Sequence, residues 1–250
     1  MNLVIVKDYQ AMSEQAFNII AQTIYSAERP VISLTTGASP LGVFKLLVKA
    51  INDGTLDISH TVFLNVDEYV GDQNAVYTVH TFMFKHLYNQ IIQRPVYFDM
   101  FNAANRNKEF EVLRYKQVMA TYPRDVQLLG LGTNGHIGAC EPGTPFSASA
   151  FCARHEESTI QSTVQLYGIS RDQAPTEMFT LGFKEIMAAK RPLLIASGKS
   201  KAEAVRRVLE EPISENCPAS CLRGHPDFTF IIDEQAASLL HKDTRTWATR

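Results

Sequence analysis

Short apolar runs recur along the chain, and longer segments with regularly spaced apolar residues lie between them. Uninterrupted apolar runs are typical of strands that are buried on both faces of a sheet. Apolar residues at every third or fourth position are typical of amphipathic helices. We expect strands at residues 3–6, 30–36, 61–66, 126–132, 178–182, 192–197 and 228–233. We expect helices at residues 12–27, 40–53, 107–122 and 201–211.

Strands that alternate with helices predict an α/β fold. We expect a doubly wound, mainly parallel sheet with helices on both faces, which is a Rossmann-like three-layer sandwich. No repeat or linker divides the sequence, so residues 1–240 are expected to form a single domain and residues 241–250 a polar C-terminal tail. Such sheets bind ligands beyond the carboxyl ends of their strands. The polar and glycine residues that follow the strands are therefore the candidates for function.

Composition and charge narrow the choice of partners. The 250 residues include 24 basic and 26 acidic side chains, so neither nucleic acid nor a membrane surface is an expected partner. The apolar patch at the N-terminus is cut by Lys7 and Asp8 and is too short for a signal peptide, and no segment could span a bilayer. Four cysteines lack the spacing of a disulfide framework or a CxxC zinc site. We expect a cytoplasmic protein that binds a small molecule.

Residues 128–146, LLGLGTNGHIGACEPGTPF, allow two functional interpretations. Gly130, Gly132 and Gly135 spell GxGxxG, which is a dinucleotide fingerprint when a helix begins at its end. The glycines and prolines that follow disfavour such a helix. The other interpretation is a catalytic loop, because His136 titrates near neutrality and Glu141 could fix its tautomer. A histidine that is merely hydrogen-bonded in a turn is the structural alternative.

Asp67 and Glu68 follow directly on the expected strand at residues 61–66. Neighbouring residues in extended chain point to opposite sides, so one carboxylate should face the ligand while the other forms bonds inside the protein. A carboxylate at the end of a strand is a candidate general base. A solvated acidic turn is the alternative for the isolated pair.

Two other junctions between a strand and a helix suit an anion. Ser39 stands where an N-cap belongs and Pro40 at the expected first helical position, and the free amides of such a helix start can bind phosphate. Lys199 and Lys201 lie at a similar junction after residues 192–197. A well-capped helix without a ligand remains the alternative for the first of these stretches.

Five segments, taken together and in this order, resemble the glucosamine-6-phosphate deaminase and galactosamine-6-phosphate isomerase family. They are TTGASPLGVFKLL, FLNVDEYVG, GLGTNGHIGACEPGTPF, TLGFKEIMAAKRPLLIASGKSKAEAV and CPASCLRGHPDF, and they extend over nearly the whole chain. The family shares its fold with the 6-phosphogluconolactonases, which usually carry Asp-Glu-Arg after the strand and a GHTAS-like loop. Tyr69 and the stretch GHIGACEPG resemble the deaminase branch instead.

The resemblance implies a deaminating aldose-ketose isomerase. Such an enzyme converts a hexosamine 6-phosphate to a ketose 6-phosphate and ammonia without a cofactor or a catalytic metal. Asp67 matches the base that moves a proton from C2 to C1 of the opened sugar. His136 matches the acid/base that opens the ring, supported by Glu141 and Asn134. The resemblance further implies substrate and phosphate contacts from Thr36, Gly37, Ala38, Ser39, Glu68, Gly135 and Lys201.

Some positions depart from the family pattern. Gln165 stands where the best-known members carry an arginine that clamps the phosphate, so either Arg171 takes its place or the site differs. Asn134 replaces an aspartate of some relatives, which leaves Glu141 as the expected main partner of His136. Cys140 replaces an asparagine. The basic residues that bind an N-acetylated activator in allosteric relatives have no match around residues 151–153, so we expect no such activation.

The sequence leaves other questions open. The C4 epimer of the substrate, gluco or galacto, is not fixed, because a few hydrogen bonds distinguish one inverted hydroxyl. A sugar-lactone hydrolase of the same fold is an alternative enzyme, and a non-catalytic sugar-phosphate sensor is an alternative of another class. Relatives occur as single chains and as assemblies, so a homo-oligomer is one of two expectations.

Overall fold

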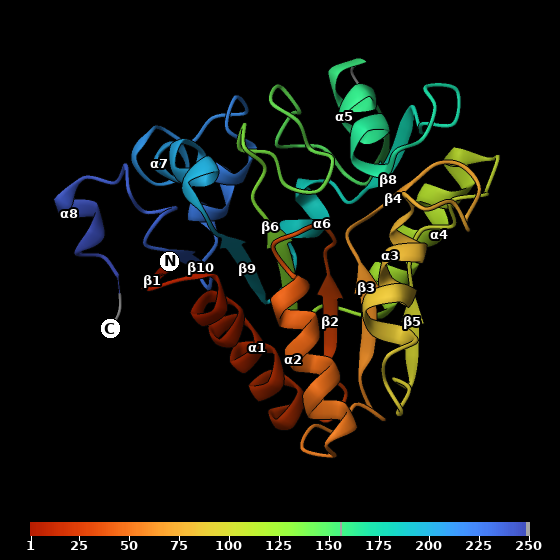
Figure 1. Ribbon diagram of the computed structural model, residues 1–250, viewed down its shortest axis with the longest axis horizontal. Helices are drawn as coiled ribbons and strands as arrows, with labels where there is room; N and C mark the ends of the chain where they lie inside the picture. The colour runs from red at the N-terminus through yellow and green to blue at the C-terminus, as the bar shows by residue number, and fades with distance from the viewer. Residues whose placement is uncertain (156, 249–250) are drawn as a thin grey trace.

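The computed structural model describes residues 1–155 and 157–248, and its centre is a seven-stranded sheet (Figure 1). In spatial order the strands are β1 (Asn2–Val6), β10 (Thr229–Asp233), β9 (Arg191–Ala196), β6 (Val126–Gly130), β2 (Val31–Leu34), β3 (Val62–Asn65) and β5 (Tyr97–Asp99). Each neighbouring pair in this sheet is parallel. The expected α/β fold with a mainly parallel sheet is therefore confirmed.

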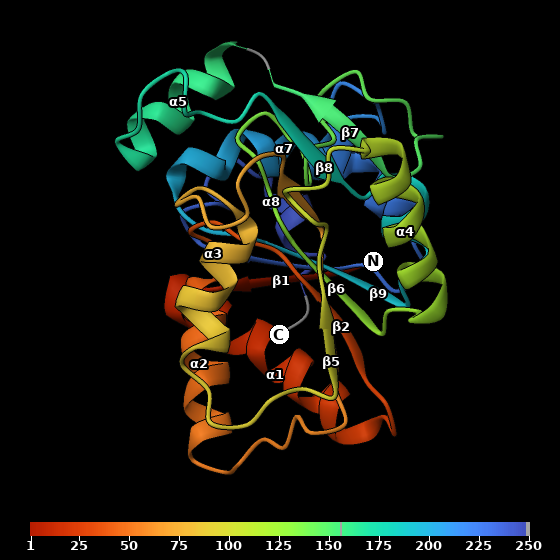
Figure 2. The same ribbon diagram turned by 90° about the vertical axis from the view of Figure 1, so that its right-hand side faces the viewer.

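Helices cover both faces of this sheet. The longer ones are α1 (Tyr9–Ser26), α2 (Leu41–Asn52), α4 (Lys108–Thr121), α5 (Glu157–Tyr167) and α7 (Ala202–Glu210). Short helical segments are α3 (Val79–Met83), η1 (Phe84–Tyr88), α6 (Phe183–Met187), η2 (Lys199–Lys201), η3 (Pro218–Gly224) and α8 (Lys242–Arg245). Figure 2 shows α2 and α3 on the opposite side of the strands from α4. None of the helices in the described part of the chain could cross a membrane.

Alternating strand residues supply two separate hydrophobic cores, as expected for a sheet covered on both faces. Leu128 and Ile195 pack with α1 and α2 on one face. Leu129 and Leu194, their neighbours in sequence, pack with α4 and α7 on the other. This arrangement gives the three-layer sandwich, and it explains why the strands have apolar residues at consecutive positions.

A second, smaller sheet lies beyond the carboxyl ends of the large one (Figure 1). Its strands are β4 (Asp67–Tyr69), β8 (Glu177–Thr180) and β7 (Phe151–Arg154), and their pairings are antiparallel. The apolar run at residues 178–182 thus forms a strand, but of this sheet and not of the large one. Val66 connects the two, because its N–H donates to Leu34 O and its carbonyl accepts from Leu181 N.

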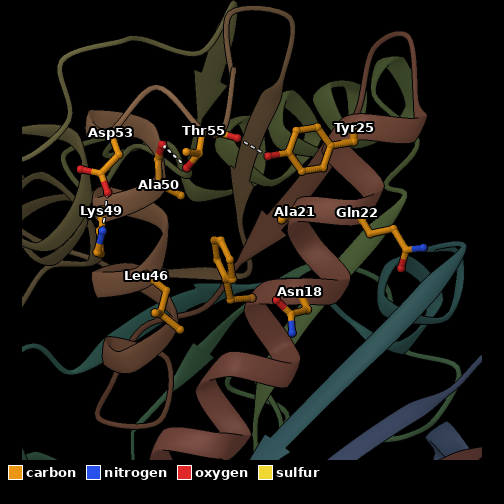
Figure 3. Close-up of a pocket in the computed structure, with 10 residues that line it drawn as sticks. Asn18, Ala21, Gln22, Tyr25, Leu46, Lys49, Ala50, Asp53 and Thr55 are labelled. Atoms are coloured by element: carbon orange, nitrogen blue, oxygen red, sulfur yellow. Dashed lines mark hydrogen bonds and ion pairs between the residues drawn. The ribbon is translucent and has the colours of Figure 1, made fainter.

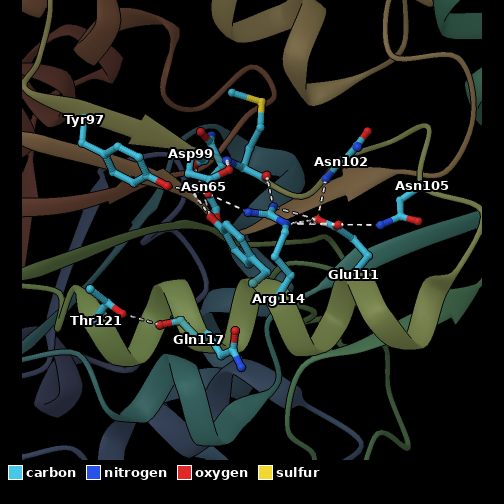
Figure 4. A network of polar contacts seen from close by, with 11 residues as sticks. Asn65, Tyr97, Asp99, Asn102, Asn105, Glu111, Arg114, Gln117 and Thr121 are labelled. Atoms are coloured by element: carbon cyan, nitrogen blue, oxygen red, sulfur yellow. Dashed lines mark hydrogen bonds and ion pairs between the residues drawn. The ribbon is translucent and has the colours of Figure 1, made fainter.

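A polar network attaches α4 to the end of β5 (Figure 4). Glu111 is fully buried, and Arg114 binds it together with Asp99. The hydroxyl of Tyr115 accepts a hydrogen bond from Asn65 N at 2.9 Å and donates one to Asn65 O at 2.7 Å. Strand β5 ends at Asp99, which pairs with Leu64 of β3. The Tyr115 hydroxyl therefore binds the backbone of the next residue, Asn65, where β5 no longer provides a partner. The network fixes the point where the chain leaves β3.

The segment expected to be a polar tail is folded against the domain through residue 248. It contains α8, and Arg245 Nη1 donates to Ala237 O at 3.0 Å. An isolated parallel bridge pairs Ala248 with Leu3 at the edge strand β1. Polar sequence at the end of a chain does not prevent docking when its backbone groups find partners.

Candidate active site

Four adjacent parallel strands deliver the predicted site residues to one edge of the sheet. Asp67 follows β3, Ser39 follows β2, His136 follows β6 and Lys201 follows β9. The direction of the strand order changes between β2 and β6, and a crevice for ligands forms outside such a switch point. In Figure 1 the green loop after β6 lies in the upper half of the view, beside α5.

The loop of residues 132–146, called the catalytic loop below, folds back on itself directly after β6. Gly132 N donates to His136 O at 2.9 Å, and Gly135 N donates to Gly132 O at 3.0 Å. Gly135 has φ +92°, which favours glycine, and a Cβ on Gly132 would lie 2.4 Å from the His136 ring. No helix begins at Gly135 in the described chain, so the geometry does not support the dinucleotide interpretation.

His136, Asn134 and Glu141 form a connected relay. His136 Nδ1 lies 2.8 Å from Asn134 Oδ1, and Asn134 Nδ2 donates to Glu141 Oε2 at 2.7 Å. Glu141 Oε1 is 3.3 Å from the same His136 Nδ1. Asn134 Oδ1 is thus the nearer acceptor for this ring nitrogen, and Glu141 is its negatively charged partner. The hydrogen bond from His136 lowers the pKa of Glu141.

Asp67 is buried at the start of β4, and its Oδ1 has no hydrogen-bond partner among the described residues. Loss of solvation raises the pKa of Asp67 from 3.8 to about 7, while the charge of His136 acts in the opposite direction. A Cβ on Gly138 of the catalytic loop would lie 3.9 Å from Asp67 Oδ2. The carboxyl group and the imidazole therefore act on each other electrostatically, and both border the same loop.

Glu68 points the other way, as the alternation of extended chain predicts. Its side chain is fully buried and accepts hydrogen bonds from the N–H groups of Tyr69, Val79 and His80, each at 2.8 Å. Burial raises the pKa of Glu68, opposed by these donors. The expected substrate contact from Glu68 is corrected, because its oxygens already bind the backbone at the start of α3. Its role is to fix β4 beside Asp67.

The loop of residues 36–39 carries the expected phosphate contacts after β2. Gly37 has φ +100° and open space where a Cβ would be. Tyr9 holds the loop to α2, because its hydroxyl donates to Ala38 O at 3.0 Å and accepts from Gly42 N at 2.7 Å. The expected N-cap at Ser39 is wrong by one position. Pro40 is the N-cap residue of α2, and no side chain caps this end.

Lys201 ends the short segment η2 and lies directly before α7. Its side chain is partly buried, and loss of solvation lowers the pKa of Lys201. No ion pair is found for it within the described part of the chain. A partly desolvated ammonium group without a counter-ion can attract an anionic ligand.

Comparisons with known proteins identify the family of the chain. The pattern of the family described as "Glucosamine-6-phosphate isomerases/6-phosphogluconolactonase" matches residues 7–230. The chain belongs to this family. Glucosamine-6-phosphate deaminases of Bacillus cereus and Bacillus thuringiensis are 37% identical to it over 243 residues, covering 96% of this chain and 89% of theirs.

Solved structures of family members show the same fold. A monomeric glucosamine-6-phosphate deaminase superposes with a TM-score of 0.90 at 36% identity, covering 96% of this chain and 100% of that chain. A 6-phosphogluconolactonase from Trypanosoma brucei gives a TM-score of 0.75 at 18% identity, covering 96% of this chain and 98% of that chain. The second likeness concerns the fold alone.

The structure places Gln165 in α5 and Arg171 in the turn that follows it. Gln165 is exposed on α5. Arg171 forms a two-point ion pair with Glu157, at 2.9 and 2.7 Å. The Arg171 guanidinium therefore has a carboxylate partner from α5 in this structure.

Residues that sequence analysis did not single out also border the site. His155, at the end of β7, stacks edge-on against Tyr69 with ring centroids 5.5 Å apart, and it interacts electrostatically with Glu141. Arg207 of α7 binds the backbone of Asn134. In the sequence, residues 217–220 (CPAS) contributed only to the family resemblance, and no motif singled out Arg207 as a site residue. No cluster of three metal-ligating side chains occurs within residues 1–155 and 157–248.

Two surface hollows have volumes of about 500 Å³, and none of the candidate catalytic residues lines either of them. One of them lies between α1 and α2 and is lined by Phe17, Tyr25 and Lys49 among others (Figure 3). Its lining residues Tyr25 and Thr55 come shortly before β2 and β3, so it opens near the amino ends of the strands. This is the opposite edge from the candidate active site.

Proposed function

We propose that the chain is an amino-sugar-phosphate deaminase that converts glucosamine 6-phosphate or its galacto epimer to the ketose 6-phosphate and ammonia. The observation that carries this proposal is the buried carboxyl group of Asp67, whose Oδ1 has no hydrogen-bond partner among the described residues and which borders the same loop as the imidazole of the histidine relay. The reaction needs two groups that transfer protons at different atoms of one sugar, and this pair supplies them.

Ring opening is the first task, and His136 performs it. Its Nδ1–H donates to Asn134 Oδ1, so the tautomer inferred from this bond leaves Nε2 free to exchange a proton with the sugar. Glu141 stabilises the imidazolium that forms, because its carboxylate lies 3.3 Å from Nδ1. Proton transfer to the ring oxygen and from the C1 hydroxyl then gives the open aldehyde.

Asp67 carries out the second task. As a carboxylate it takes the proton from C2, which forms an enolamine, and it then returns a proton to C1. The product is an imine at C2, and addition of water followed by loss of ammonia gives the ketose. A pKa of about 7 suits a base that must accept and release the same proton near neutral pH.

Substrate orientation comes from the phosphate. Lys201 offers a partly desolvated positive charge, and the loop of residues 36–39 offers backbone N–H groups and the Ser39 hydroxyl. The sugar then extends from the ends of β2 and β9 toward Asp67 and His136, which follow the neighbouring strands β3 and β6.

Ammonia release from glucosamine 6-phosphate and from galactosamine 6-phosphate tests the proposal. We expect turnover with at least one epimer, and the ratio of the two kcat/KM values identifies the natural substrate. The absence of ammonia from both at high enzyme concentration would reject the deaminase. Hydrolysis of a sugar lactone, followed by pH-stat, would then identify the hydrolase, and tight binding of the ester without product would identify the sensor.

We also propose a cytoplasmic location for this enzyme. The four cysteines at positions 140, 152, 217 and 221 are free thiols, as expected in a reducing compartment. Fractionation of cells that express the chain checks this, and recovery from an oxidising compartment would contradict it.

A further inference from the structure

The catalytic loop is held by chain that is about eighty residues away in sequence. Gly135 O accepts a hydrogen bond from Ala219 N at 2.9 Å. Gly143 N donates to Glu215 O at 2.9 Å, and Phe146 N donates to the Glu215 side chain at 2.8 Å. The segment of residues 215–219 therefore binds both the beginning and the end of the catalytic loop.

Arg207 connects this segment to the relay. Its Nη1 donates to Asn134 O at 3.1 Å, and its Nη2 donates to Asn216 O at 2.7 Å. Its Nε lies 3.4 Å from the Glu211 carboxylate, which orients the guanidinium. All three nitrogens of one planar group are used, so the distance between the two carbonyls is fixed.

Asn134 is the residue through which this constraint acts. Its side-chain oxygen accepts from both the backbone N–H and the ring of His136, and its side-chain nitrogen donates to Glu141. Its backbone carbonyl has Arg207 as a donor. Displacement of this carbonyl would therefore move the acceptor that orients the His136 ring.

Neighbouring packing removes the remaining freedom of the loop. A Cβ on Gly135 would lie 2.9 Å from Cys217 Sγ, so the loop and the segment of residues 215–219 are in close contact. Proton transfer depends steeply on geometry, because a misplacement of about 1 Å can cost on the order of a hundredfold in rate. A charge that anchors the loop is then a means to hold the imidazole in its reactive position.

We propose that Arg207 is a positioning residue for His136, which fixes the relay by binding the carbonyl of Asn134. The proposal rests on the deaminase function described above. In this role Arg207 does not contact the substrate. Helix α7, which carries Arg207, begins directly after Lys201, so one helix connects the proposed phosphate contact with the residue that positions His136.

The adjacent residue provides a matched control. Arg206 lies on the same helix and binds the carboxylates of Glu203 and Glu211, and it forms no hydrogen bond with the catalytic loop in the described part of the chain. Arg206→Gln removes one positive charge from α7 just as Arg207→Gln does. A difference between the two variants therefore reports the contact with Asn134 and not the loss of charge on the helix.

The experiment compares Arg207→Gln, Arg207→Lys and Arg206→Gln with the unmodified enzyme. Steady-state ammonia release gives kcat and KM, and NMR of the enzyme with 15N-labelled histidine follows the Nδ1–H of His136. For Arg207→Gln we expect kcat to fall by about ten- to a hundredfold, KM to change less than about threefold, and the His136 resonance to move. Arg206→Gln should match the unmodified enzyme in all three.

Arg207→Lys keeps the charge but lacks the planar fork of N–H donors, so its kcat should lie between those of the glutamine variant and the unmodified enzyme. If the glutamine variant does not fold, the lysine variant carries the test alone. An unchanged His136 resonance, or an unchanged kcat despite a moved resonance, would overturn the positioning role. Failure of the unmodified enzyme to release ammonia would instead reject the proposed function.

Discussion

Replacement of Asp67 by asparagine should make the folded protein more stable while it abolishes catalysis. Asp67 is buried, its Oδ1 has no hydrogen-bond partner within residues 1–155 and 157–248, and loss of solvation raises its pKa from 3.8 to about 7. A tenfold change in an acid constant corresponds to about 1.4 kcal/mol, so the ionised carboxylate destabilises the fold by about 4 kcal/mol at high pH. Asparagine has a similar shape and carries no charge.

The sign follows from proton binding. Between about pH 4 and pH 7 the folded protein holds the Asp67 proton more tightly than the unfolded chain does, so the stability of the unmodified enzyme falls as pH rises through this window and is level above it. The variant lacks this loss. The unfolding free energy of Asp67→Asn minus that of the unmodified enzyme should therefore increase by about 3 kcal/mol between pH 5 and pH 8. For a chain of this size, this corresponds to an increase of about 6–12 °C in the difference between the two Tm values.

Thermal and urea unfolding of both proteins at pH 5 and pH 8 measure this difference. The buried amide lacks partners too, at a cost of about 1–3 kcal/mol, so the absolute Tm at one pH is less informative than its change with pH. Asp172→Asn is the control, because hydrogen bonding to Ser170 lowers the pKa of that exposed carboxyl and gives no gain at high pH. An advantage of Asp67→Asn that does not grow from pH 5 to pH 8 would refute the desolvation of this group.

Three further predictions concern the site and its support. The kcat/KM value, corrected for ionisation of the substrate, should rise with pH and become level above about 7, because Asp67 must be deprotonated; a flat profile from pH 5 to pH 7 would exclude it as the base. Lys201→Met should weaken substrate binding by about ten- to a hundredfold in KM, whereas Lys199→Met should not. Tyr115→Phe should lower the unfolding free energy measured in urea by about 1–3 kcal/mol, because the N–H and C=O groups of Asn65 in β3 lose their partner. Tyr88→Phe is the control and should cost less, since the buried Tyr88 hydroxyl has no partner among the described residues.

Sequence patterns predicted the strands of the large sheet well, with one exception. Six of the seven apolar runs form its strands, because a strand covered on both faces needs consecutive apolar residues. The seventh strand of the large sheet, β5, was not predicted, because its residues 97–99 are only partly buried and include Asp99, which binds Arg114 in the polar network. Strand β7 is also only partly buried or exposed, and β4 begins with the two carboxyl residues Asp67 and Glu68, so neither strand has an apolar run that could predict it.

Local sequence also predicted which residues gather at the carboxyl edge, since the positions that follow parallel strands meet there. Local sequence did not show that Asp67 and Glu68 differ in their hydrogen-bond partners. The two are adjacent, yet one has a carboxyl oxygen without a partner while the other binds three backbone N–H groups. The start of α3 decides this difference.

The sequence by itself determined the α/β fold and the family, and it predicted Asp67 and His136 as the two proton-transfer residues, because these depend on residue type and on spacing along the chain. Tertiary structure alone decided the pKa of Asp67, the closer contact of His136 with Asn134, and the anchoring of the catalytic loop by Arg207. Solvation and hydrogen bonding depend on which atoms meet in space, and here those atoms come from segments many residues apart.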